Sequence, residues 1–164
     1  MNIETTEEIT WELDALASAI SSFFERKVKG EQGRELGMLT RELVLKAGVG
    51  TSHLIEEEAA GICKHWQALP AIGSEEGNLP LVKTKDGKLY LRRFFEYEKQ
   101  VAQALKDRLS LPPVPASQAL IDFFKTYLAD QVDDQQALAV GVALQKNLLL
   151  LTGGPGTGKT RTIV

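Results

Sequence analysis

A glycine-rich loop directly after a run of leucines constrains the fold of this chain more than any other feature. Residues 148–152 read LLLLT, which has the length and the uninterrupted apolar character of a strand buried on both faces. Residues 153–160 follow at once as GGPGTGKT and satisfy the pattern G-x-x-x-x-G-K-[ST], which requires a strand before it and a helix after it. The sequence therefore predicts the first strand and the phosphate-binding loop (P-loop) of an α/β nucleotide-binding domain.

Each position of this loop suits the binding of a polyphosphate. Glycines let the backbone approach the phosphates, so that successive N–H groups can donate to them. Lys159 places a positive charge on the β- and γ-phosphates, and Thr160 supplies a hydroxyl ligand for Mg²⁺. A turn that binds nothing is the alternative, and the preceding apolar run and the GKT sequence argue against it. The candidate nucleotide-binding residues are Gly153, Gly154, Pro155, Gly156, Thr157, Gly158, Lys159, Thr160 and Arg161.

The remainder of the chain predicts helices and one hairpin. Apolar residues recur every three or four positions, which predicts a first helix over about 6–28 and a second helix that ends near residue 47. The same periodicity predicts further helices over 56–69, 94–109, 117–128 and 134–145. The expected core face of the first helix comprises Ile9, Leu13, Leu16, Ile20 and Phe23. Two apolar runs flank Asp86-Gly87, a dipeptide typical of a hairpin turn.

Three prolines, Pro112, Pro113 and Pro115, divide the chain into segments. We expect residues 1–110 to form a mainly α domain with a hairpin near 80–91, and residues 111–116 to form a stiff linker. Residues 117–164 then supply two helices and the beginning of the nucleotide-binding domain.

The composition is that of an ordinary soluble protein. Hydrophobic residues make up 43% of the chain and charged residues 25%, which excludes a disordered tail, and one cysteine excludes a disulfide-rich miniprotein. No apolar run approaches the roughly 20 residues that span a bilayer, and the first residues lack the features of a signal peptide. We expect a cytoplasmic protein without membrane contact, in which Cys63 stays reduced.

Residues 81–108 are the one basic segment, with eight Lys and Arg against four Asp and Glu. Their cations alternate with aromatic residues, which would suit contact with DNA phosphates and bases. A solvated hairpin with core aromatics is the interpretation that we favour. The residues concerned are Lys83, Lys85, Lys88, Arg92 and Arg93, with Tyr90, Phe94, Phe95 and Tyr97.

Residues 1–108 contain no pattern that resembles an active site. Cys63 and His65 are two potential metal ligands, but no second pair accompanies them, so a zinc site is not predicted. The acidic residues 56–58 are interpreted as the first turn of a helix.

Two segments resemble a known family. Residues 135–140, QQALAV, with the strand and GGPGTGKT after them, resemble the start of a superfamily 1 helicase core. Residues 87–98, GKLYLRRFFEYE, resemble a segment that follows a small hairpin in the RecD family of exodeoxyribonuclease V subunits. The resemblance implies that Gln136 contacts the adenine of ATP, although a solvated position on a helix is the alternative because Gln135 adjoins it.

The resemblance to RecD implies an ATP-dependent 5′→3′ DNA helicase subunit that acts with RecB-like and RecC-like subunits in the repair of double-strand breaks. Residues 1–110 would dock onto the partners, and residues 117–164 would begin a truncated RecA-like domain. The later helicase motifs would lie beyond residue 164, so we expect an N-terminal fragment that is inactive alone and holds no catalytic residue. A AAA-type remodeller or loader, or a helical interaction module, is the alternative.

Overall fold

The structure is a computed structural model that describes residues 3–113, 115–128, 134–156 and 159. The chain divides into two compact units, residues 1–99 and 100–164, and each is treated by itself. The described residues form six α-helices, one 3₁₀ turn and four short strands. The predicted mainly α architecture with a small β-structure is therefore confirmed. None of the described helices is both long enough and apolar enough to cross a membrane.

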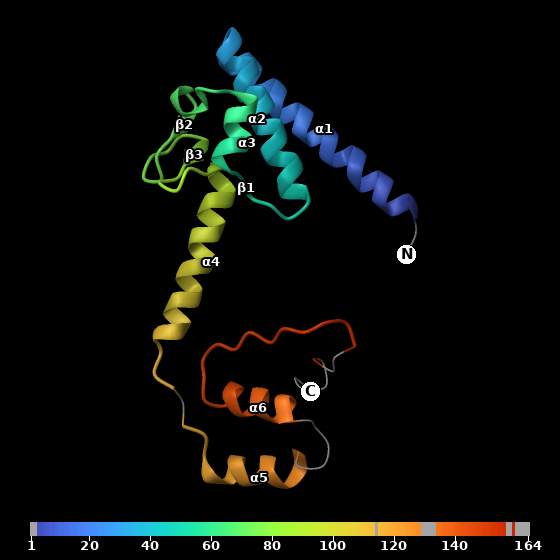
Figure 1. The fold of residues 1–164 in the computed structure, drawn as a ribbon, viewed down its shortest axis with the longest axis vertical. Coiled ribbons are helices and arrows are strands. Elements are labelled where there is room, and N and C mark those ends of the chain that lie inside the picture. The colour runs from blue at the N-terminus through green and yellow to red at the C-terminus, as the bar shows by residue number, and fades with distance from the viewer. Residues whose placement is uncertain (1–2, 114, 129–133, 157–158, 160–164) are drawn as a thin grey trace. The chain divides into compact units, whose positions relative to one another are not determined.

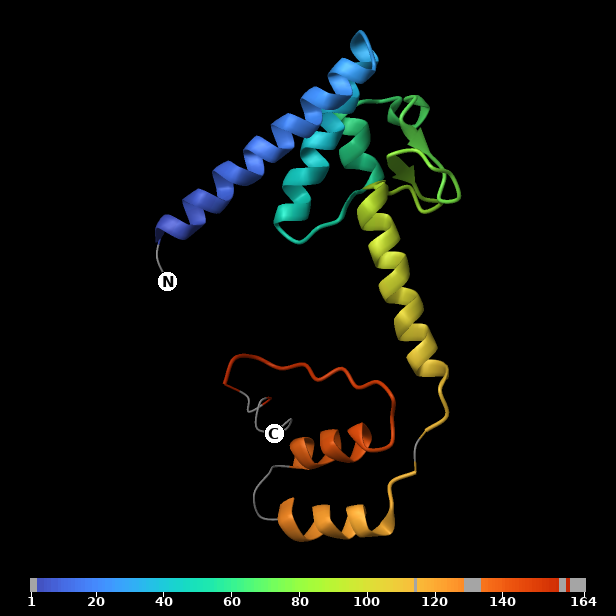
Figure 2. The same cartoon turned by 180° about the vertical axis from the view of Figure 1, so that it is seen from behind.

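A pair of helices forms one side of the first unit. α1 (Ile3–Lys27) and α2 (Glu31–Gly48) lie against each other, joined by a turn in which Gly30 has φ +81° (Figures 1 and 2). On α2, Leu36, Leu39 and Leu43 recur on one face and are fully buried.

The predicted core face of α1 is right only in part: Ile20 packs against the core and Leu13 lies beside Gly48. Leu16 and Phe23 are about half exposed, whereas Ala17, Ser21 and Phe24 are buried. The glycines of α2 give the physical reason. A Cβ at Gly37 would lie 2.8 Å from Ser21 Oγ, so the two helices approach closely where both carry small residues. Ile9 belongs to the residues whose side chains the structure does not describe.

The predicted hairpin is confirmed and is the centre of a four-stranded sheet. β3 (Leu81–Lys83) and β4 (Leu89–Leu91) pair antiparallel, and Gly87 in their turn has φ +81°. β1 (His53–Leu54) pairs antiparallel with β4, and β2 (Ile72–Gly73) pairs parallel with β3, which gives the order β1-β4-β3-β2. The sheet and the helix pair share one core, centred on the following fully buried residues: Leu36, Leu39, Leu43, Leu54, Leu81 and Leu89.

The predicted helix over 56–69 is shorter in the structure. α3 (Glu56–Ile62) ends at Cys63, and a single 3₁₀ turn (Trp66–Ala68) follows it. Trp66 and Leu69 still reach the core, with exposed fractions of 1% and 2%. The chain bends at residues 63–65, and both side chains still pack into the core. Their burial therefore does not depend on one continuous helix, which is what the periodicity predicted.

α4 (Arg92–Ser110) follows β4 directly and runs from the first unit into the second. It is tied to the sheet by Tyr90, whose hydroxyl donates to Glu98 Oε2 at 3.3 Å and whose ring lies 5.7 Å from the ring of Phe95. Throughout its length α4 buries no residue completely. Helix formation at 92–110 agrees with the prediction within two residues.

The second unit contains two predicted helices and lacks the predicted strand. α5 (Gln118–Leu128) and α6 (Asp134–Ala143) form close to the expected positions. Residues 148–152 have no strand conformation, and the exposed fraction of Leu150 is 78%. A parallel strand requires neighbouring strands for its backbone hydrogen bonds, and no strand is present among the described residues of this unit. The expected start of a RecA-like sheet is therefore not formed in this structure.

Candidate functional site

The glycine-rich loop is the first candidate site, and its lysine turns back onto it. Lys159 Nζ donates hydrogen bonds to the carbonyl oxygens of Gly153 at 2.5 Å and Gly154 at 2.6 Å. A turn lies at Pro155 and Gly156, where φ of Gly156 is +78°. Non-glycine residues rarely adopt this conformation, so the glycine is required by the path of the backbone. The loop is solvent-exposed between residues 152 and 156.

A second contact anchors the segment that leads into this loop. Asn147 Nδ2 donates to the carbonyl oxygens of Leu111 at 3.2 Å and Pro112 at 3.0 Å. One side-chain amide thus connects the proline-rich segment with residue 147, six residues before the loop. This contact lies within the second unit.

Of the remaining predicted nucleotide-binding residues, the structure describes only some. Gln136 lies on α6 and is partly buried, while its neighbour Gln135 is exposed. Thr157, Gly158, Thr160 and Arg161 lie outside the described residues, so the hydroxyl ligand for Mg²⁺ stays a prediction.

Three cations of the basic segment contact neighbouring residues of the first unit. Lys83 donates to Gln67 Oε1, and Lys88 pairs with Asp86 at 2.7 Å. The Lys88 ammonium and the Thr84 hydroxyl hold the pKa of Asp86 at about 2. Arg93 lies over the ring of Tyr97, with its guanidinium carbon 5.4 Å from the ring centroid. These contacts favour the interpretation of a solvated hairpin over a DNA-binding strip.

Arg92 has a structural role that the sequence did not indicate. Its guanidinium donates to three backbone carbonyls, those of Ser74, Glu75 and Leu79, at 3.0 to 3.1 Å. The side chain is 19% exposed and also pairs with Glu96 at 3.3 Å. Arg92 therefore fixes the long connection between β2 and β3 and serves the fold of the first unit.

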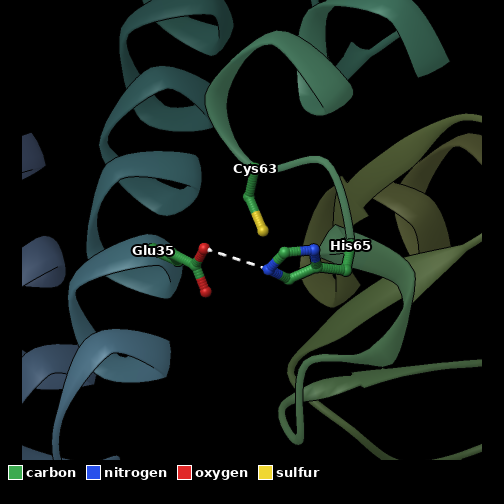
Figure 3. A group of neighbouring side chains, drawn as sticks. All are labelled: Glu35, Cys63 and His65. Carbon is green, nitrogen blue, oxygen red and sulfur yellow. Dashed lines mark ion pairs between the residues drawn. The ribbon is translucent and has the colours of Figure 1, made fainter.

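A cluster of three metal-ligating side chains lies where α3 ends beside α2 (Figure 3). Glu35 comes from α2, and Cys63 and His65 come from the bend after α3. His65 Nε2 lies 3.6 Å from Glu35 Oε1. Burial and a hydrogen bond with Glu35 raise the pKa of the Cys63 thiol above its usual value. Sequence spacing paired Cys63 with His65 but missed Glu35, because only the packing of α2 against α3 brings it near.

Comparisons with known proteins bear on the resemblance. A protein named RecBCD enzyme subunit RecD from Buchnera aphidicola is 34% identical over 85 residues, which are 52% of this chain and 14% of the relative. The protein of that name from Mycolicibacterium smegmatis is 36% identical over 98 residues, 60% of this chain and 17% of the relative. About half of this chain is thus similar to proteins named RecD.

A third RecD relative, from Mycobacterium tuberculosis, is 37% identical over 78 residues, 48% of this chain and 13% of the relative. The matches thus cover about half of the chain and less than a fifth of each RecD protein. No protein-family model matches the chain. The RecD resemblance predicted from the sequence is confirmed by these relatives, while the activity of a whole RecD protein lies beyond what the matched part covers.

Proposed function

We propose that this chain is the N-terminal part of an ATP-dependent 5′→3′ DNA helicase subunit of exodeoxyribonuclease V, acting in recombinational repair of double-strand breaks. The observation that carries the proposal is the similarity of about half the chain to proteins named RecBCD enzyme subunit RecD. The GGPGTGKT sequence at 153–160 supports it independently, because it is the phosphate-binding element that such a motor needs.

Two features of the described part of the loop support the proposed binding of a triphosphate. Its backbone is glycine-rich and exposed, and Gly156 has a φ that a bulkier residue would strain. Lys159 holds its ammonium beside Gly153 and Gly154, at the start of the loop, where phosphate oxygens could replace the two carbonyl acceptors. In the proposal Thr160 holds Mg²⁺, Arg161 adds positive charge, and Gln136 recognises adenine. ATP with Mg²⁺ supplies the free energy for unwinding.

The proposed partners are RecB-like and RecC-like subunits and DNA. Residues 1–110 would dock onto the subunits in the cytoplasm. Three aliphatic side chains on one face of α4, spaced by four residues, support a protein contact there. Val101, Leu105 and Leu109 are 59%, 38% and 68% exposed, and subunit interfaces bury such side chains. A motor of this kind also needs a Walker B carboxylate and a second lobe, which the proposal assigns to the whole RecD-type protein.

The test is co-expression of the full-length protein with the RecB-like and RecC-like subunits of the same cell. The proposal expects a stable ternary complex and Mg²⁺- and ATP-dependent unwinding of blunt-ended duplex DNA. Co-purification with neither subunit would count against docking. A sensor arginine and a helical lid after the loop, in place of helicase motifs, would favour the remodeller.

A further inference from the structure

Glu35, Cys63 and His65 bring three different metal ligands to one point of the first unit (Figure 3). One ligand atom from each, a carboxylate oxygen, the thiol sulfur and an imidazole nitrogen, lies within 4.8 Å of both others. Thiolate, imidazole and carboxylate are the ligand types that Zn²⁺ takes in proteins. We propose that these three residues bind one zinc ion, with water in the fourth position.

The fold holds the three residues at fixed places in the backbone. Glu35 precedes Leu36 on α2, and Leu36 is fully buried in the core. The backbone N–H of Cys63 donates to the Ala59 carbonyl at 2.9 Å, which closes the last turn of α3. Trp66, one residue after His65, is 1% exposed. The ligands therefore come from rigid elements, as a preformed site requires.

The separations need only a small adjustment to suit zinc. Bonds of 2.0 to 2.3 Å in a tetrahedral site place ligand atoms about 3.5 Å apart, so the longest separation must shorten by about 1 Å. The His65 side chain is 74% exposed and can turn toward the ion at little cost. Its exposure also gives the ion and the fourth ligand access from solvent.

The charges at this point favour a divalent cation. The Glu35 side chain is 15% exposed, and Cys63 is 3% exposed, so a carboxylate and a thiolate would lie together in a poorly solvated place. Glu31, one helical turn before Glu35, adds a further negative potential at the sulfur. A zinc ion would compensate the two ligand charges, which otherwise oppose burial.

Such an ion would crosslink α2 to the bend between α3 and the 3₁₀ turn. These two parts of the core are about thirty residues apart in the sequence. All three ligands belong to the first unit, so the ion's role would be to stabilise that unit. Its presence or absence is independent of the function proposed above.

The test measures zinc binding by the purified 164-residue chain, reduced and freed of metal with a chelator. Isothermal titration with Zn²⁺ should give one saturable site per chain, and the melting temperature should rise with zinc and fall again with chelator. Cobalt in place of zinc should give tetrahedral absorption in the visible and a sulfur-to-cobalt charge-transfer band. Cys63→Ser should abolish that band, and Cys63→Ser, His65→Asn and Glu35→Gln should each weaken zinc binding about tenfold or more.

The matched control is Glu57→Gln, which removes an exposed carboxylate from α3 and should leave the affinity unchanged. Circular dichroism of the metal-free variants shows whether each still folds. Absence of saturable binding by the unaltered chain, or binding that Cys63→Ser and His65→Asn leave intact, would overturn the proposal.

Discussion

The Arg92 guanidinium donates a hydrogen bond to the backbone carbonyl of Ser74, with 3.0 Å between Nη2 and the oxygen. The backbone N–H of Arg92 donates to the Pro80 carbonyl at 2.8 Å, so one residue contacts both ends of the connection between β2 and β3. Carbonyls in such a connection have no strand partner, and the five N–H donors of arginine can satisfy several of them at once. The first residue of α4 thereby stabilises the sheet that precedes it.

Replacement of Arg92 should destabilise the first unit strongly. Arg92→Ala removes three hydrogen bonds from a charged donor, and we expect the free energy of unfolding to fall by about 2–3 kcal/mol. Arg92→Lys should recover little of this, because an ammonium cannot reproduce the forked geometry. Urea unfolding followed by circular dichroism measures both changes. Arg93→Ala is the control, since Arg93 is exposed and should change stability by about 0.5 kcal/mol or less.

Two glycines in helices should respond oppositely to alanine. A Cβ at Gly33 would lie 1.8 Å from the Val28 carbonyl oxygen, so Gly33→Ala forces α1 and α2 apart and should cost about 1–3 kcal/mol. A Cβ at Gly61 in α3 meets nothing within 4 Å, so Gly61→Ala should gain about 0.5–1 kcal/mol from helix propensity. The urea midpoints of the two variants measure these changes in stability. Equal effects of the same sign would contradict the observed closeness of the α1–α2 contact.

Tyr90 should make the first unit sensitive to alkaline pH. Burial and the Glu98 carboxylate raise the pKa of Tyr90 from 10 to about 12. The unfolded chain therefore ionises first, and the stability contributed by the neutral phenol is complete below pH 10 and is lost as the pH rises toward 12. Tyr90→Phe should remove the step near pH 12 from an absorbance titration of tyrosinate. A titration of the variant that keeps this step would show that Tyr90 is not the late group.

Glu58 should contribute to stability at neutral pH and lose that contribution in acid. A hydrogen bond from Lys46 and one from the Ile55 N–H, at 3.0 Å, lower the pKa of Glu58 below 4.5. A lowered pKa stabilises the fold above pH 4.5, and the contribution disappears as the pH falls through the folded pKa. The side chain is 38% exposed, so Glu58→Gln should cost only about 0.5–1 kcal/mol at pH 7 and less at pH 3. The control is Glu57→Gln, which removes an exposed carboxylate and should change stability by about 0.5 kcal/mol or less.

Much of the fold followed from local sequence signals. Periodicity predicted five of the six helices of the described chain closely, and Asp86-Gly87 predicted the hairpin between β3 and β4. Strands β1 and β2 have two residues each, too few for an alternating pattern, and were missed. The face of α1 was predicted only in part: Leu13 lies beside Gly48, as the periodicity indicates, whereas Ser21 rather than a large apolar residue lies beside Gly37.

The candidate sites also differ in whether local sequence signals could predict them. The phosphate loop is a local motif, so 153–160 could be found from the sequence alone. Glu35 lies near Cys63 and His65 only because α2 packs against α3. The carbonyl contacts of Arg92 depend on the path of the backbone between β2 and β3. The run at 148–152 was predicted as a strand from its composition, but strand formation depends on partner strands, which residues elsewhere must supply.

The central claim is that the loop around Lys159 drives a RecD-type motor. The direct test is unwinding of a duplex with a 5′ single-stranded tail by the reconstituted three-subunit complex, with the RecB-like motor inactivated. Lys159→Gln should abolish ATP-dependent unwinding while the subunits still co-purify, and the control Lys146→Gln, an exposed lysine of the same unit, should leave it unchanged. Unwinding that survives Lys159→Gln at the rate of the unaltered complex would contradict the account.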